Sequence, residues 1–142
     1  MYYVLLVSHG EMAPGLHTAV KMIAGDNEWV MSAGLHDGSS ADDLAAEVKG
    51  LLQGVTAADR LVVLADLMGG SPLTTAMKVV AEMGLLTNTV ALAGMNLPMA
   101  LTAVLAGPDV ELDLLAETLS GEACNGVEEF VIPADEDEDE DL

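Results

Sequence analysis

Short aliphatic runs alternate with helix-like segments along this chain, and this alternation limits the folds open to it more than any other feature. The predicted strands cover residues 2–7, 29–33, 60–65 and 89–93. Strands that alternate with helices are joined by right-handed crossovers and lie parallel in one sheet. The sequence therefore predicts an α/β fold, a mostly parallel open sheet with helices on both faces.

Helix start and stop signals fall in the gaps between these runs. Pro14 suits the first turn of a helix that ends near residue 23, and Gly25 suits its C-terminal cap. Ser40 and Asp43 resemble a capping box for a second helix. These signals predict helices over residues 14–23, 41–52, 73–83, 99–105 and 112–119.

Composition narrows the class of protein. The chain has 142 residues, enough for one domain, which we place at residues 1–133. Four Lys and Arg residues against 24 Asp and Glu residues give a formal net charge of -20. This charge argues against binding nucleic acid through phosphate contacts. The unbroken acidic run 135–141 predicts a disordered tail over residues 134–142.

Three features favour a cytoplasmic protein. Cys124 has no second cysteine to pair with, so a reducing compartment suits the chain. No basic segment precedes the first apolar run, which argues against a signal peptide. The long apolar stretch 89–107 is interrupted by Asn96 and Pro98, which argues against a membrane span.

Two titratable residues lie at the carboxyl ends of predicted strands, where parallel sheets usually bind their ligands. His9 ends the first predicted strand and Asp66 directly follows the third. If these strands are neighbours, as in a flavodoxin-like order, both side chains reach one crevice at the carboxyl edge of the sheet. A carboxylate that accepts the Nδ1 proton of His9 leaves Nε2 as a nucleophile. A packing histidine and a capping aspartate are the structural alternatives.

A glycine-rich turn could supply the anion-binding groups that such chemistry needs. Gly10 frees space beside His9, and the glycine pair ending at Gly70 lets the backbone approach an anion. Ser71 can add a hydroxyl hydrogen bond. The alternative is a plain tight turn in which Ser71 is the N-cap and Pro72 the first helical residue.

The other two histidines have more ordinary interpretations. His17 lies inside the first predicted helix, where a surface or packing role is expected, and His36 lies in an acidic loop as a solvated or helix-capping residue. The His and Cys residues show no zinc-site spacing. No phosphate-binding loop or dinucleotide fingerprint occurs either. We therefore predict neither a metal site nor a cofactor.

Three segments together resemble a known family. Val-Ser-His-Gly surrounds His9, Leu-Ala-Asp-Leu-Met-Gly-Gly-Ser-Pro ends at Pro72, and Ala-Gly-Met-Asn-Leu-Pro-Met ends at Met99. In this order they resemble the mannose-family enzyme IIA components of the bacterial phosphoenolpyruvate-dependent sugar phosphotransferase system. The resemblance covers roughly residues 2–132.

The resemblance implies a function and a set of partners. It implies that the phosphocarrier HPr phosphorylates His9, that Asp66 orients the ring and that Ser71 contacts the phosphoryl group. His9 would then pass the group to a IIB component or domain for sugar uptake, meeting the membrane IIC and IID components only indirectly. The implied partner surface comprises Met12, Met68, Asn96, Pro98 and Met99.

Two departures and two alternatives accompany the resemblance. Met68 replaces the aromatic residue common before the glycine pair, and Thr74 stands where Asn is frequent, which leaves partner contacts and sugar specificity open. The chain could instead donate phosphoryl groups to dihydroxyacetone kinase, or be a non-enzymatic flavodoxin-like interaction module. The sequence does not name the sugar or say whether IIB is a separate chain.

The last apolar run predicts an assembly. Residues 127–132 form a short β-rich segment with no helix behind it. A sheet of four parallel strands leaves an edge that proteins normally cover. The resembled family closes this edge by exchanging a C-terminal strand, so we expect a short antiparallel strand exchanged within a homodimer.

Overall fold

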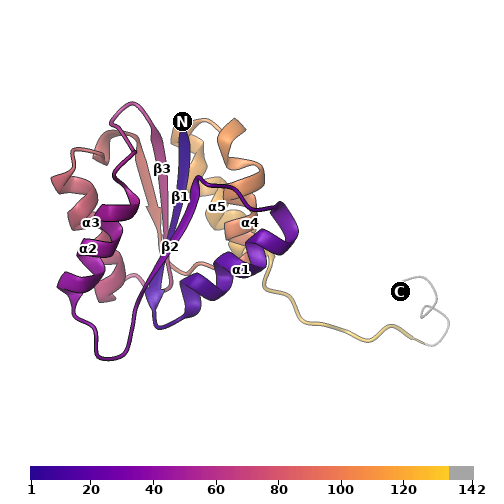
Figure 1. Cartoon of the computed structure of the whole chain (residues 1–142). Coiled ribbons are helices and arrows are strands. Elements are labelled where there is room, and N and C mark those ends of the chain that lie inside the picture. Colours follow the sequence, from indigo (N-terminus) through magenta and orange to yellow (C-terminus); the bar gives the residue numbers. More distant parts are fainter. Residues whose placement is uncertain (135–142) are drawn as a thin grey trace.

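A parallel sheet forms the centre of the computed structural model, which describes residues 1–134 (Figure 1). Its strands are β1 (Tyr2–His9), β2 (Val30–Leu35), β3 (Arg60–Ala65) and β4 (Thr89–Leu92), in the order β2-β1-β3-β4. All pairings along the sheet are parallel. The predicted open sheet is confirmed, and the first and third strands are neighbours as in a flavodoxin-like order.

Helices cover both faces of this sheet, as the sequence predicts. In Figure 1, α2 and α3 lie on one side, and α1, α4 and α5 lie on the other. The helices are α1 (Met12–Ala24), α2 (Ala41–Leu51), α3 (Ser71–Glu82), α4 (Leu97–Leu105) and α5 (Leu112–Asn125), with short 3₁₀ turns at Leu86–Asn88 and Gly107–Asp109. No helix within residues 1–134 is long and apolar enough to cross a membrane.

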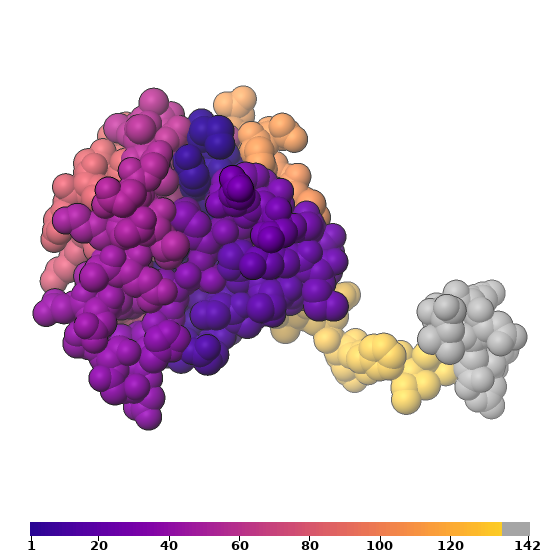
Figure 2. All heavy atoms as spheres, viewed as in Figure 1, coloured from indigo at the N-terminus to yellow at the C-terminus, as the bar shows by residue number. Residues whose placement is uncertain are grey.

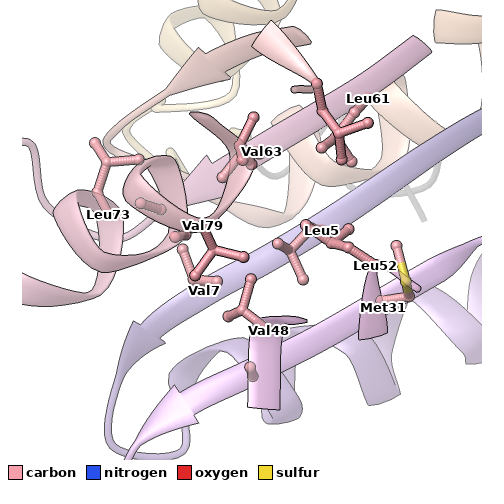
Figure 3. Close-up of a cluster of buried hydrophobic side chains, with 14 of the residues drawn as sticks. Leu5, Val7, Met31, Val48, Leu52, Leu61, Val63, Leu73 and Val79 are labelled. Atoms are coloured by element: carbon pink, nitrogen blue, oxygen red, sulfur yellow. The ribbon is translucent and has the colours of Figure 1, made fainter. Parts of the chain in front are cut away.

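Strand periodicity explains why the aliphatic runs are continuous. Leu5 and Val7 point to the core beneath α2 and α3, where Val63 and Val79 join them (Figure 3). The intervening residues of β1 point to the other core, beneath α1, α4 and α5. Because successive side chains alternate between two buried faces, both sets must be apolar. The sequence of β1 is therefore apolar at every central position.

Two helix ends follow the predicted local signals, whereas α5 runs on to Asn125, beyond the predicted end at residue 119. Ser40 and Asp43 form the predicted capping box at the start of α2, with N···O distances of 3.0 and 3.1 Å. Gly25 ends α1 with a φ of 88°, a conformation that suits glycine. The alternative with Ser71 as an N-cap is wrong, because Gly70 is the N-cap and Ser71 is the first residue of α3.

The C-terminal segment 127–132 leaves the body of the protein as an extended chain (Figure 2). It forms no strand in the single chain. Its apolar side chains are 68–87% exposed: Val127, Phe130, Val131 and Ile132. The predicted exchange with a partner is not tested by one chain. The acidic run 135–141 lies outside the described residues.

Candidate active site

The carboxyl edge of the sheet brings His9 and Asp66 together. Val7 of β1 lies opposite Ala65 of β3, so His9 at the end of β1 and Asp66 just after β3 reach the same edge of the sheet. His9 Nδ1 lies 2.8 Å from Asp66 Oδ2, and the backbone N–H of His9 donates to the same oxygen at 3.0 Å. Two residues that lie far apart in the sequence thus form the predicted pair.

Hydrogen bonding fixes the charge of Asp66 and the tautomer of His9. Burial of the Asp66 carboxyl opposes its ionisation, but the hydrogen bonds from His9 and from the Leu67 N–H outweigh this and lower its pKa. An ionised carboxylate can only accept hydrogen bonds, so the Nδ1 of His9 carries the shared proton. Nε2 of the neutral ring is then unprotonated and makes no hydrogen bond within residues 1–134.

The start of α3 lies directly beside this free nitrogen. A Cβ atom built on Gly70 would lie 2.6 Å from His9 Cε1 and 3.4 Å from Nε2, so only glycine leaves the ring in place. Ser71, the first residue of α3, is exposed, and its hydroxyl has no hydrogen-bond partner in the described chain. The amides and positive dipole of a helix N-terminus favour an anion here. The turn at Gly70 can therefore receive a charged group without a Lys or Arg.

A serine that the sequence analysis missed supports the turn after β1. Ser8 is fully buried, and its Oγ accepts the N–H of Ala13 at 2.7 Å, which caps the first turn of α1. Gly10 has a φ of 54°, and its N–H donates to Leu35 O at 2.8 Å. The sequence gives only a weak signal for this role of Ser8, because the hydrogen bond depends on the shape of the turn between Ser8 and Ala13. The loop that follows His9 is thereby tied to both α1 and β2.

The other histidines do not contact Asp66. His17 Nδ1 lies 2.8 Å from Ser32 Oγ on β2, and burial, with a smaller contribution from Lys21, lowers the pKa of its imidazole. His36 Nδ1 lies 2.6 Å from Glu11 Oε2 in an exposed contact. No cluster of three or more His, Cys, Asp or Glu side chains among residues 1–134 could hold a metal ion.

Exposed methionines flank the site. Met12 begins α1 and is half exposed, and Met68 follows Asp66 by two residues and is 74% exposed. Leu67, which the sequence analysis did not select, is also exposed. An apolar rim of this kind suits a protein partner.

The third motif has mainly a structural role. Asn96 Oδ1 accepts the Met99 N–H at the start of α4, and its amide donates to Ala123 O. Pro98 is half buried and packs closely against Gly126, because a Cβ added there would collide with its ring. Met99 is only 2% exposed and lies in the core, so its selection as a partner-surface residue is wrong.

The chain is similar to several known proteins in sequence and fold. A family model described as PTS system fructose IIA component matches residues 3–120. A solved mannose/sorbose specific IIA subunit from Enterococcus faecalis is 27% identical with a TM-score of 0.78, covering 93% of this chain and 96% of that one. Component EIIA from Streptococcus agalactiae is 26% identical with a TM-score of 0.77, covering 91% and 97%. A PTS IIA protein associated with the fucose utilization operon from Streptococcus pneumoniae shares the fold at 24% identity and a TM-score of 0.74, covering 90% and 92%.

Proposed function

Because the chain belongs to the PTS system fructose IIA component family, we propose that it is a phosphohistidine carrier acting in the cytoplasm. In this proposal His9 accepts a phosphoryl group from phosphorylated HPr and passes it to a IIB component or domain. The observation that carries the proposal is the 2.8 Å contact between His9 Nδ1 and Asp66 Oδ2. In the neutral ring this contact places the proton on Nδ1 and leaves the Nε2 lone pair free to attack phosphorus.

The transfer needs no proton to move during the attack. The Nε2 lone pair forms a bond to phosphorus while the bond between phosphorus and its donor atom on HPr breaks. The ring gains positive charge in this step, and the ionised Asp66 stabilises it through the Nδ1–H. The reverse sequence, with the acceptor nucleophile of IIB attacking phosphorus, releases His9 in its starting tautomer.

Neutral groups hold the transferred phosphoryl group in this proposal. Gly10 and Gly70 leave room for its oxygens, and the Ser71 hydroxyl donates one hydrogen bond. The N-terminus of α3 adds its dipole and free amides. This arrangement suits a carrier, because a site without a Lys or Arg can release the group to the next protein.

The partner-binding surface in this proposal is the rim around His9. Met12, Leu67 and Met68 supply exposed apolar area, and Asn96 and Pro98 belong to the neighbouring loop at the same edge of the sheet. Flexible methionine side chains can pack against more than one protein. HPr and IIB would therefore use overlapping surfaces in turn.

Transfer through His9 is tested by labelling. The purified protein is incubated with phosphoenolpyruvate, enzyme I and HPr, and its intact mass is measured. His9→Ala should abolish the gain of one phosphoryl group, whereas His17→Ala and His36→Ala should still be labelled. Labelling that survives in His9→Ala contradicts the assignment. The labelled protein is then mixed with IIB or with dihydroxyacetone kinase. The acceptor that removes the phosphoryl group shows whether the chain serves sugar uptake or the kinase.

We also propose that the chain forms a homodimer through residues 127–132. The support is the exposure of this apolar segment together with the open edge of the sheet, since β4 is an edge strand. Light scattering on the full chain and on a chain truncated after Gly126 tests this. The full chain should be a dimer and the truncated chain a monomer, so an unchanged dimer after truncation rules out this mode of assembly.

A further inference from the structure

A second histidine contacts the loop that carries His9. His36 follows β2 directly, and its Nδ1 lies 2.6 Å from Glu11 Oε2. Glu11 is the N-cap residue of α1, but its side chain makes no cap hydrogen bond. The carboxylate instead turns toward β2, so the contact bridges the start of α1 and the end of β2.

The same loop is packed closely against β2 at two further points. The Gly10 N–H donates to Leu35 O at 2.8 Å. A side chain at Gly34 would collide with Gly10 O, although the backbone of Gly34 is not in a left-handed conformation. Gly34 is therefore explained by the close approach of the loop. The turn from His9 to Glu11 is supported by β2 as well as by Asp66, which directly follows β3.

The contact with His36 also matters because Glu11 carries a negative charge close in sequence to His9. Glu11 lies two residues after His9, and its carboxylate would repel an incoming phosphoryl group. The chain has only four Lys and Arg residues, and Arg60 begins β3 at the opposite edge of the sheet. His36 is the partner that Glu11 contacts, so the position of this carboxylate depends on His36.

We propose that His36 is a positioning residue for phosphoryl transfer, which acts on His9 through its contact with Glu11. It holds the His9–Glu11 turn against the end of β2 and keeps the Glu11 carboxylate turned toward β2. The proposal rests on the function proposed for His9. It assigns to β2 a part in the reaction that the pair of His9 and Asp66 does not include.

The test is a double-mutant cycle on single-turnover transfer from phosphorylated HPr. Transfer rates are measured against HPr concentration for the full chain, for His36→Ala and Glu11→Ala, and for the double variant. His36→Ala should lower the saturating rate by about two- to fivefold, the range set by one exposed side-chain contact, with little change in the half-saturating concentration. In the Glu11→Ala background the same substitution should have no further effect.

A matched control separates positioning from general stability. His17→Gln removes another contact between α1 and β2, the one to Ser32, away from His9, and should leave the saturating rate unchanged. His36→Leu provides a second variant without a donor if His36→Ala does not fold. An unchanged saturating rate overturns the proposal, as does an equal loss in the Glu11→Ala background or a change in half-saturation alone. Failure of the full chain to label at His9 would instead refute the proposed function.

Discussion

Replacing Asp66 by Asn tests the central pair most directly. The Asp66 carboxylate accepts three N–H groups, two from His9 on Oδ2 and one from Leu67 on Oδ1. Asn offers one acceptor oxygen and one donor group. If its oxygen faces His9, the tautomer is kept but the negative charge is lost. If its amide faces His9, Nδ1 must become the acceptor and Nε2 becomes protonated.

The magnitude follows from the charge beside the ring. A full negative charge about 4 Å from the developing positive ring is worth about 4 kcal/mol at an effective dielectric constant of about 20. The His9 side chain is 47% exposed and that of Asp66 10%, so solvent screens part of this interaction. We take about 2–4 kcal/mol after screening, which corresponds to a loss of roughly 30- to 1,000-fold in transfer rate.

The assay is rapid-quench transfer from phosphorylated HPr, followed by intact mass. Asp43→Asn is the matched control, because it makes the same change in charge and also removes a carboxylate that accepts a backbone N–H, but at the start of α2. Thermal unfolding should show that both variants are folded. Near-normal transfer by a folded Asp66→Asn protein would refute the orienting role, as would an equal loss in Asp43→Asn.

Three further predictions concern single residues. Gly70→Ala should displace the His9 ring and slow transfer more than tenfold while the protein stays folded, and equal rates by the quench assay contradict this. Ser71→Ala should slow transfer by about two- to tenfold, the value of one hydrogen bond, and a loss as large as that of Asp66→Asn contradicts it. Because the pKa of His17 is lowered in the folded state, its neutral form stabilises the fold above about pH 6.5 and this stability is lost as the pH falls below that value. In urea unfolding, the free energy of unfolding should fall less at acid pH for His17→Gln than for the unaltered chain. An equal pH dependence of the two proteins would contradict this role of His17.

The parts of the fold that local physics determines could be predicted from the sequence. The capping box of Ser40 and the glycine after α1 are signals within a few residues, so they identify helix ends without knowledge of the tertiary structure. The strands were also recognisable, because burial on both faces requires unbroken aliphatic runs. Strand order then brings His9 to Asp66, which the motif positions already indicated.

The remaining features depend on distances that the sequence does not contain. Met99 follows a turn motif and was assigned to the surface, but the rotation of α4 places it in the core. Ser8 and the contact of Glu11 with His36 depend on the path of one loop against β2. The predicted strand exchange of residues 127–132 involves a second chain, so the structure of one chain does not test it.

The register between β1 and β3 makes the His9–Asp66 contact a probe of folding. Val7 opposite Ala65 is the last pair before the two polar residues. A slip of one residue would displace Asp66 by about 3.3 Å and turn its side chain to the other face of the sheet. A collapsed but misregistered chain could keep its helices and much of its apolar burial, yet it could not form the 2.8 Å contact. In a refolding experiment, the nuclear magnetic resonance signal of the His9 imidazole would therefore report when β1 and β3 reach the correct register, independently of when the chain becomes compact.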